Sequence, residues 1–218
     1  MKGVKIKIMK KRFVISMAMF AACIISISAS AQNRLKMELS YNVSTPVGSF
    51  KNDYINKTSF RGGIGEISYT INSKFSAGLQ SGYQNYYQKY DRQVYKLEGN
   101  QTVSAVLTNS MDVIPLLLRG TFHPLGANAS AIVQPYISAG AGVNLINYGQ
   151  YLGEFGGTQS STAFAAQAGA GILIPFGKRI NQTTFKLGAT YNYSNYNHNE
   201  ISKLNSVGIN AGVVFRLR

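Results

Sequence analysis

The sequence predicts an all-β protein, an eight-stranded antiparallel up-and-down transmembrane β-barrel after a cleaved signal peptide. Three observations predict it: a charged and then apolar leader, stretches in which apolar residues alternate with small or polar ones, and gaps that are alternately short and long. The ending SVGINAGVVFRLR shows the alternation, with Val207, Ile209 and Val213 on one face and Ser206 and Asn210 on the other. The apolar face of each strand has to be covered by lipid or by a protein core.

The N-terminal segment has the three parts of a secretory signal peptide. Six Lys and Arg residues precede Phe13, an uncharged apolar run extends to about Ile27, and a small-residue cleavage site ends at Ala31. We therefore predict a signal peptide at residues 1–31 and an outer-membrane β-barrel domain at residues 32–218. The protein is expected to use the secretory pathway and to reside in the outer membrane of a Gram-negative bacterium.

Charge and cysteine content narrow the classes of partner. The chain has 22 Lys and Arg against 8 Asp and Glu, but six of the bases lie in the leader. The remaining bases form no run, so nucleic acid is not an expected partner, whereas an anionic lipid surface is compatible. Cys23 lies in the apolar run, so the mature chain has no thiol for a disulfide or a metal. A lipoprotein that begins at Cys23 is the alternative.

Eight segments with two-residue alternation follow the leader, and no helical period interrupts them. The predicted strands are 34–44, 60–71, 74–87, 103–122, 131–146, 163–174, 183–194 and 204–217. Twelve residues at about 3.3 Å each, tilted by about 45°, rise roughly 28 Å, close to the apolar band of a membrane barrel. An even strand count fits the same architecture.

The gaps between these segments alternate in length. The short ones are 72–73, 123–130 and 175–182, and the longer polar ones are 45–59, 88–102, 147–162 and 195–203. An up-and-down barrel in the outer membrane has short turns on the periplasmic side and long loops outside. The gap lengths therefore predict which end of each strand faces the cell exterior.

Aromatic residues are sorted between the two ends of the predicted strands, as expected for a belt at each membrane interface. Those near the long gaps are Tyr83, Tyr86, Tyr87, Tyr90, Tyr148, Tyr151, Tyr191, Tyr193 and Tyr196. Those near the short turns or the C-terminus are Phe75, Phe122, Phe176, Phe185 and Phe215.

Six charged side chains share the polar face of the strands, five in the half near the short turns and Glu66 somewhat higher. They are Lys36, Glu38, Glu66, Arg119, Lys186 and Arg216. In the opposite register they would face lipid, where Arg or Lys costs about 2–4 kcal/mol at mid-bilayer. We therefore expect a buried network of ion pairs and hydrogen bonds, whose simplest role is that of a structural plug.

The glycine and proline residues give further predictions about the strands of the barrel wall. Glycines on the polar face make room inside a barrel that its own side chains fill, so no open channel is expected. Pro115 and Pro135 cannot donate a ladder hydrogen bond, which predicts bulges or strand starts at these two positions.

Three stretches resemble a known family: DVIPLLLRGTF at 112–122, QPYISAGAGVNL at 134–145 and VGINAGVVFR at 207–216. They are similar to the small outer-membrane β-barrel domain proteins of Bacteroidetes, including the PorT-like group, and more distantly to barrels of the OmpX and OmpA type. The resemblance implies insertion by the barrel-assembly machinery, which in this class reads a C-terminal strand that ends in an aromatic residue. Here Phe215 is followed by three more residues, and no catalytic or ligand-binding residue is implied.

The sequence offers little chemistry for catalysis. His123 and His198 fall on opposite sides of the predicted membrane, so they cannot share a metal, and no cofactor is expected. A lipid-A-modifying enzyme with His198, Glu200 and Ser194 or Ser202 at the outer rim is one alternative. A soluble periplasmic β-barrel that binds a small apolar ligand, with the two faces inverted, is another. The preferred prediction is a non-enzymatic barrel whose loops contact lipopolysaccharide, a partner protein or an external ligand.

Overall fold

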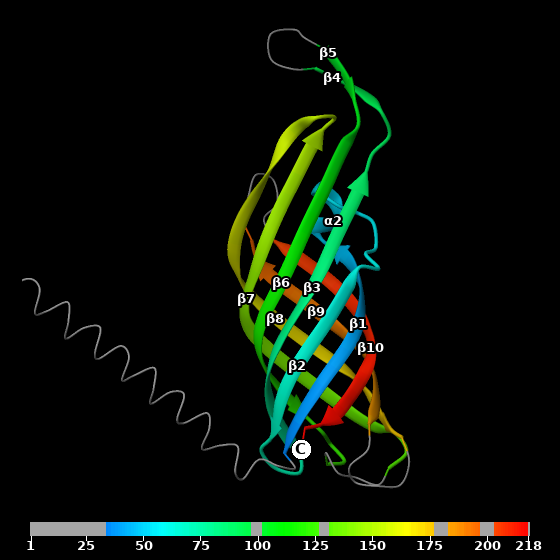
Figure 1. The fold of residues 1–218 in the computed structure, drawn as a ribbon, viewed down its shortest axis with the longest axis vertical. Helices are drawn as coiled ribbons and strands as arrows, with labels where there is room; N and C mark the ends of the chain where they lie inside the picture. The colour runs from blue at the N-terminus through cyan, green and yellow to red at the C-terminus, as the bar shows by residue number, and fades with distance from the viewer. Residues whose placement is uncertain (1–33, 97–101, 127–130, 177–182, 197–202, 218) are drawn as a thin grey trace, which may run out of the picture.

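The computed structural model describes residues 34–96, 102–126, 131–176, 183–196 and 203–217, and eight of its strands form one closed barrel (Figure 1). The wall strands are β1 Leu35–Val47, β2 Gly62–Thr70, β3 Phe75–Lys89, β6 Leu107–Phe122, β7 Gln134–Leu152, β8 Phe155–Pro175, β9 Thr184–Asn195 and β10 Leu204–Arg216. The order around the wall is β1-β10-β9-β8-β7-β6-β3-β2, and all neighbours are antiparallel. The predicted fold class is confirmed.

The barrel has two distinct ends. We call the end with the β2–β3, β6–β7 and β8–β9 connections the turn end, and the opposite end the loop end. At the first of these turns, Asn72 Oδ1 accepts hydrogen bonds from the backbone N–H groups of Lys74 at 2.9 Å and Phe75 at 2.8 Å. This is the Asx pattern that the short Asn-Ser gap favours.

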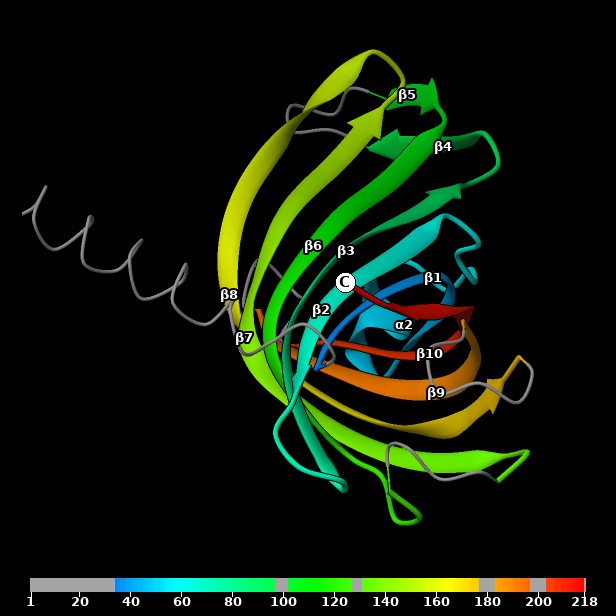
Figure 2. The ribbon, with the colours of Figure 1, turned by 60° about the horizontal axis from the view of Figure 1, so that its bottom comes forward.

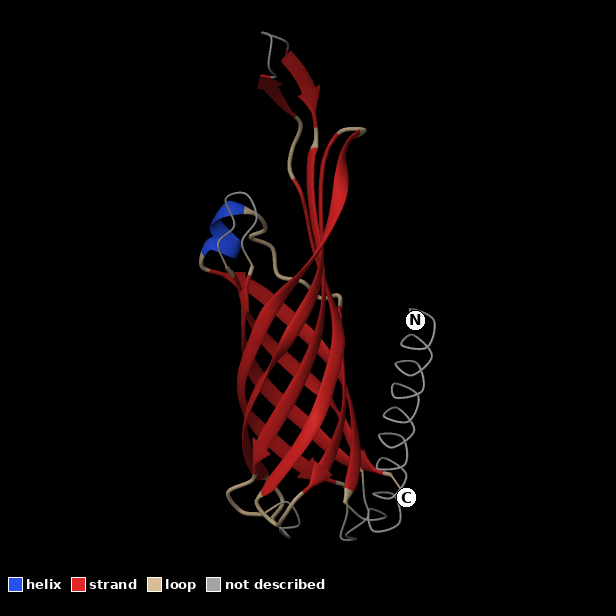
Figure 3. Cartoon of the chain, turned by 90° about the vertical axis from the view of Figure 1, so that its left-hand side faces the viewer, coloured by secondary structure: helices blue, strands red, loops and turns tan. Residues whose placement is uncertain are grey.

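Two predicted loops are strands instead. β7 and β8 continue as a hairpin as far as the Leu152–Phe155 register pair, through most of the gap predicted at 147–162. The gap at 88–102 holds β4 Gln93–Lys96 and β5 Thr102–Ala105, a separate two-stranded sheet above the barrel (Figure 3). The prediction was wrong here because these strands lie beyond the apolar band, where pairing persists without an apolar face.

The predicted loop at 45–59 contains a single helical turn, α2 Ser49–Asp53. Gly48 precedes it with φ 64°, a conformation that glycine adopts without strain, and this lets the chain turn sharply out of β1. Figure 2 shows the strands curving around α2. No helix in the described part of the chain is long and apolar enough to cross a bilayer.

The two prolines are accommodated in different ways. Pro135 is the second residue of β7, so the predicted strand start is confirmed there. Pro115 lies inside β6, where the β3 ladder stops at Ser81–Leu116 and resumes at Gln84–Val113. Neither strand carries an extra residue, so this is an interrupted ladder rather than the predicted bulge, because proline has no N–H to donate.

The outward face of the wall is apolar. Leu118, Leu79 and Ile209 are 70 %, 62 % and 60 % exposed, and Leu39 and Leu187 belong to the same band. Phe75 and Phe122 pack with ring centroids 4.9 Å apart near the turn end. An inverted barrel with a packed apolar centre would bury these side chains, and the structure has the opposite arrangement.

The tyrosine belt is only partly as predicted. Tyr83, Tyr87 and Tyr191 are exposed on the outward face. Tyr86, Tyr148 and Tyr196 are buried instead, which corrects their assignment to a belt. Tyr86 and Tyr148 share the inward parity of their strands, so the alternation itself places their side chains inside.

Candidate functional site

The interior of the barrel is polar near the turn end and is crossed there by two ion pairs. Lys186 Nζ on β9 donates to both carboxylate oxygens of Glu38 on β1, each at 2.6 Å. Ser40 Oγ donates to Glu38 Oε1 at 2.9 Å, and Lys186 Nζ lies 4.9 Å from the centroid of the Tyr136 ring. Both charged side chains are buried. The Glu38 carboxylate accepts hydrogen bonds from a donor on β9 and a donor on its own strand β1, so its charge is satisfied there.

The second ion pair joins β6 to β2 across the intervening strand β3. Arg119 Nη1 donates to Glu66 Oε2 at 2.7 Å and to Gln80 Oε1 at 3.1 Å. Arg119 Nη2 donates to Ser138 Oγ on β7 at 2.9 Å. One guanidinium therefore contacts three strands besides its own, and it ties this side of the wall together through the lumen.

The other two predicted charges lie at the turn end. Lys36 and Arg216 are half-buried and face each other in the β1–β10 register. The structure thus joins four of the six predicted residues into two ion pairs. Lys36 and Arg216 are like charges, so this end of the lumen has more bases than acids among the predicted residues.

His123 was predicted in a periplasmic turn; it directly follows β6, and its side chain is buried at the turn end of the lumen. Its Nε2 lies 3.2 Å from Ser76 Oγ. Burial, reinforced by the positive charges of Lys36 and Lys186, lowers the pKa of His123 to about 4. The ring is therefore neutral at physiological pH. The sequence carried a signal for this position, since extending the inward parity of β6 beyond Phe122 reaches His123.

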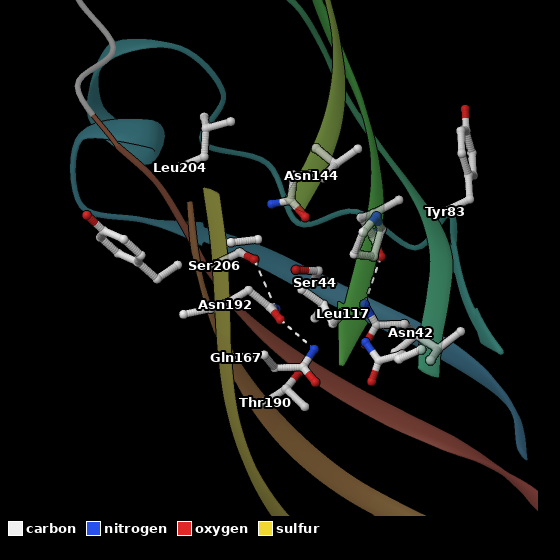
Figure 4. Close-up of a pocket in the computed structure, with 18 of the residues that line it drawn as sticks. Asn42, Ser44, Tyr83, Leu117, Asn144, Gln167, Thr190, Asn192, Leu204 and Ser206 are labelled. Carbon is white, nitrogen blue, oxygen red and sulfur yellow. Dashed lines mark hydrogen bonds between the residues drawn. The ribbon is translucent and has the colours of Figure 1, made fainter. Parts of the chain in front are cut away.

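A cavity of about 70 Å³, with a mostly apolar lining that also contains amide and hydroxyl groups, lies between the ion pairs and the loop end (Figure 4). Its lining includes Asn42, Ser44, Gln84, Asn144, Gln167, Thr190, Asn192 and Ser206. Two chains of hydrogen bonds cross this lining, and the dashed lines in Figure 4 mark contacts of this kind. This layer has amides and hydroxyls but no charge, and sequence analysis did not single it out.

The hydrogen-bond chains leave acceptors directed into the cavity. Asn42 Nδ2 donates to Gln84 Oε1 at 2.8 Å, and Gln167 Nε2 donates to Asn192 Oδ1 at 2.8 Å. Asn42 Oδ1, Gln167 Oε1 and Thr190 Oγ1 then have no partner among the described residues. A cavity of this size with several free acceptors suits a small cluster of water molecules.

An aromatic plug closes the loop end. Phe50 and Ile55 are fully buried, and Phe50 meets the edge of Tyr86 with ring centroids 5.0 Å apart. Tyr54 stacks on Tyr148 at 4.7 Å. The plug is completed by Met111, Ile146, Ala163, Tyr196 and Leu204. Sequence reasoning missed it, although the apolar residues at 50, 54 and 55 have the spacing of one helical turn.

Hydrogen bonds hold this plug in place. Tyr54 Oη donates to the backbone carbonyls of Gly149 at 2.6 Å and Ser110 at 2.9 Å. The Tyr54 carbonyl accepts from Asn109 Nδ2 at 2.9 Å and from Tyr90 Oη at 3.0 Å. Burial, followed by the effect of the nearby Tyr148, raises the pKa of the Tyr54 hydroxyl, so it stays protonated and able to donate.

A row of polar residues on the outer face marks where the apolar band ends. Asn85, Asp112, Asn147 and Ser160 follow one another in register across β3, β6, β7 and β8. Asp112 Oδ1 accepts from Tyr83 Oη at 2.6 Å and from Asn85 Nδ2 at 2.7 Å. Ser160 Oγ donates to Asn147 Oδ1 at 2.7 Å. Beyond this row the four strands continue as a sheet that rises from the barrel (Figure 3).

Of the four residues named for a catalytic centre at the outer rim, the structure describes Ser194. His198, Glu200 and Ser202 lie outside the described residues. Ser194 is buried in the wall of the lumen rather than at the surface. Within the described residues, no three His, Cys, Asp or Glu side chains are grouped to hold a metal. The predicted leader at 1–31, with Cys23, also lies outside the described part of the chain.

The chain matches a family of known proteins. The model for the outer membrane protein beta-barrel domain matches residues 15–216, nearly the whole chain. Comparison with curated proteins gives no match.

Solved structures of small barrels are similar in fold. Neisserial surface protein A is 14 % identical, with 84 % of this chain and 97 % of that chain covered and a TM-score of 0.54. The N-terminal β-barrel domain of Pseudomonas aeruginosa OprF is 19 % identical, with coverages of 84 % and 98 % and a TM-score of 0.42. Ail of Yersinia pestis is 16 % identical, with coverages of 84 % and 97 % and a TM-score of 0.43.

Proposed function

Because this chain belongs to the family of outer membrane protein beta-barrel domains, we propose that it is a non-enzymatic protein that acts through its extracellular surface rather than as a pore. In this proposal the turn end faces the periplasm and the loop end faces outward. The narrower likeness to the PorT-like group of Bacteroidetes stays a prediction, as do the signal peptide and the secretory route.

The observation that carries the proposal is that the lumen is obstructed at two levels. The pairs Lys186–Glu38 and Arg119–Glu66 cross it toward the turn end. The aromatic plug around Phe50 fills it at the loop end. The small cavity lies between these layers. A solute would have to displace both layers, whereas the surface beyond the wall is freely accessible.

Conductance across a planar bilayer tests this proposal. The full mature chain is folded into detergent, checked for the shift in gel mobility on boiling that closed barrels show, and then added to the bilayer with a general porin as the positive control. We expect no stable conductance steps. Repeated conductance steps as large as those of the porin control would contradict the proposal. Unchanged gel mobility on boiling would contradict the closed barrel itself.

A lipid-A-modifying activity is the alternative, and it has its own test. Lipid A from a deletion strain complemented with the wild-type gene or with a His198→Ala variant is compared by mass spectrometry. We expect the same spectrum in both strains and in the uncomplemented strain. A mass change that depends on His198 would replace the surface role with an enzymatic one.

The partners follow from the same proposal. Exposed basic side chains outnumber exposed acids around the loop end: Lys51, Lys57, Arg61, Lys89, Arg92 and Lys203 against Asp53, Asp91 and Glu154. Arg61 also lies 5.9 Å from the Tyr87 ring centroid, near the outer boundary of the apolar band. This charge balance suits the phosphates of lipopolysaccharide. Insertion by the barrel-assembly machinery and a protein partner at the loops belong to the same proposal.

A further inference from the structure

The seam that closes the barrel brings two like charges together. β1 and β10, the first and last strands of the wall, lie side by side (Figure 1). Lys36 on β1 and Arg216 on β10 are direct register partners at the turn end of this seam. Directly opposite residues of an antiparallel pair have Cβ atoms about 4.5–5.5 Å apart, and like charges at this spacing are destabilising. Without a counter-charge, the two cations would therefore weaken the seam.

The acids in this half of the lumen are engaged by other bases. Glu38 is the next inward residue after Lys36 on β1, but its carboxylate accepts from Lys186 and from Ser40. Glu66 accepts from Arg119. The chain has eight acids, and these two are the ones that the described residues place in the turn-end half of the lumen. Neither of them forms an ion pair with Lys36.

Neutral donors surround the same position. Ser68 on β2 is the other register partner of Lys36, and it shares the inward face. Further along β2, Thr70 Oγ1 is buried without a hydrogen-bond partner among the described residues. The side chain of His123 is only 6 % exposed, and its Nδ1 has no partner among them either. The charge of Lys36 contributes to the lowered pKa of this ring, so the two side chains lie near each other.

The chemistry of this cluster selects its ligand. Two cations call for an anion of double charge, and the additional donors call for several acceptor oxygens. A phosphate group offers both, since a guanidinium matches its oxygens bidentately and an ammonium binds it as a point charge. We propose that Lys36 and Arg216, together with Ser68, Thr70 and His123, form a binding site for a phosphate group at the turn-end mouth of the lumen.

Barrel closure assembles this site. Its two cations come from the first and last strands of the wall, so they meet only when β10 pairs with β1. A ligand that binds the folded chain but not the unfolded chain stabilises the fold by mass action. Phosphate is therefore expected to stabilise the closed barrel. In the proposed orientation the site faces the periplasm, where the group can belong to inorganic phosphate, to a phosphate monoester or to a phospholipid headgroup.

Urea unfolding of the full mature chain tests the site. The chain is folded into a detergent that contains no phosphate, at about pH 7.5, and inorganic phosphate replaces chloride at constant ionic strength. Once phosphate exceeds its dissociation constant, we expect the folding equilibrium constant to rise about tenfold for each tenfold increase in phosphate. Sulfate has the same shape and charge and should act alike. Succinate, a dicarboxylate, should have a much smaller effect.

A matched pair of variants separates the site from the charge of the whole turn end. Lys36→Gln removes one of the two opposed cations, so it is expected to abolish the effect of phosphate and to raise stability in chloride alone. Lys74→Gln removes an exposed cation from the β2–β3 turn at the same end and should keep the full effect. The mobility shift on boiling checks that each variant forms the barrel.

Nuclear magnetic resonance gives a second measurement. Phosphate added to the isotope-labelled chain should shift the amide signals of Lys36 and Ser68 and the ring signals of His123. The signals of Phe50 and Tyr54 in the plug should stay in place. Shifts spread evenly over both ends of the barrel would contradict a single site.

Dimethyl phosphate distinguishes the sources of the group, because it is a singly charged diester like a phospholipid headgroup. A gain equal to that of phosphate would support the site and assign it to a headgroup, and a weaker gain would support the site and assign it to inorganic phosphate or a monoester.

Four results would overturn the proposal. They are no gain with phosphate in the wild type, an equal gain in Lys36→Gln, loss of the gain in Lys74→Gln, and an equal gain with succinate. The proposal goes beyond the surface role, so a failed site in an intact, non-conducting barrel would leave that role standing.

Discussion

At the scale of single residues, strand parity predicted the charged interior well. Glu38, Arg119 and Lys186 each sit on the polar face of an alternating strand, and the structure places all three in the lumen. Their partners could not be predicted, because which charges meet depends on the stagger of strands that are not sequence neighbours. Lys186 meets Glu38 only because β10 closes the barrel between their strands.

The Arg119–Glu66 pair gives the first prediction. Glu66→Gln leaves the buried Arg119 without a counter-charge, and breaking such a pair costs about 3–5 kcal/mol. Urea unfolding in detergent or lipid should show this loss. The double variant Glu66→Gln with Arg119→Met removes both charges and should lose distinctly less than Glu66→Gln alone. If the two variants lose the same stability, the pair does not act as a unit.

His123 gives a prediction of pH dependence. Its pKa is lowered to about 4 in the folded chain from an ordinary value of 6.5, so between these values the unfolded chain binds a proton that the folded chain does not. Stability is therefore expected to fall as pH drops from about 6.5 toward 4, by about 2 kcal/mol between pH 7.5 and pH 5. The His123→Gln variant should lack this part of the slope. An identical loss in wild type and variant would show that other groups cause it.

At the scale of elements, the sequence predicted strands inside the apolar band better than those beyond it. Within the band, alternation is strong because one face must be apolar. Residues 155–160 of β8 are exposed on both faces of the sheet, so GGTQSST reads as a loop although it pairs as a strand. The plug around Phe50 was missed because one helical turn is too short for a periodicity.

The protruding hairpin should be dispensable for the barrel. Gly149 and Thr158 are register partners, so replacing residues 150–157 by Asn-Gly joins them through a two-residue hairpin turn. Tyr148 and its stacking on Tyr54 are kept. The shortened chain is expected to retain its mobility shift on boiling. A chain that no longer folds would show that the hairpin stabilises the barrel.

At the scale of the whole molecule, the two obstructing layers act in series. Removing one should leave the other closed, so the plug variant Phe50→Ala with Ile55→Ala is expected to stay non-conducting. Adding Arg119→Met and Glu66→Gln weakens the second layer, and brief conductance steps are expected only in this combined variant. Planar-bilayer recording distinguishes the cases. Equal conductance in the plug variant alone would mean that the ion pairs do not obstruct the lumen.

The seam between β1 and β10 has a consequence for biogenesis. The first and last strands of the domain are bonded from Lys36–Arg216 to Val47–Asn205, so the cylinder cannot be completed until its final residues arrive. A chain that ends before β10 would leave the backbone N–H and C=O groups along two strand edges unpaired in hydrocarbon, where each unsatisfied polar group costs several kcal/mol. Premature termination near the 3′ end of the gene should therefore yield an unfolded chain that envelope proteases degrade, and no partly functional protein.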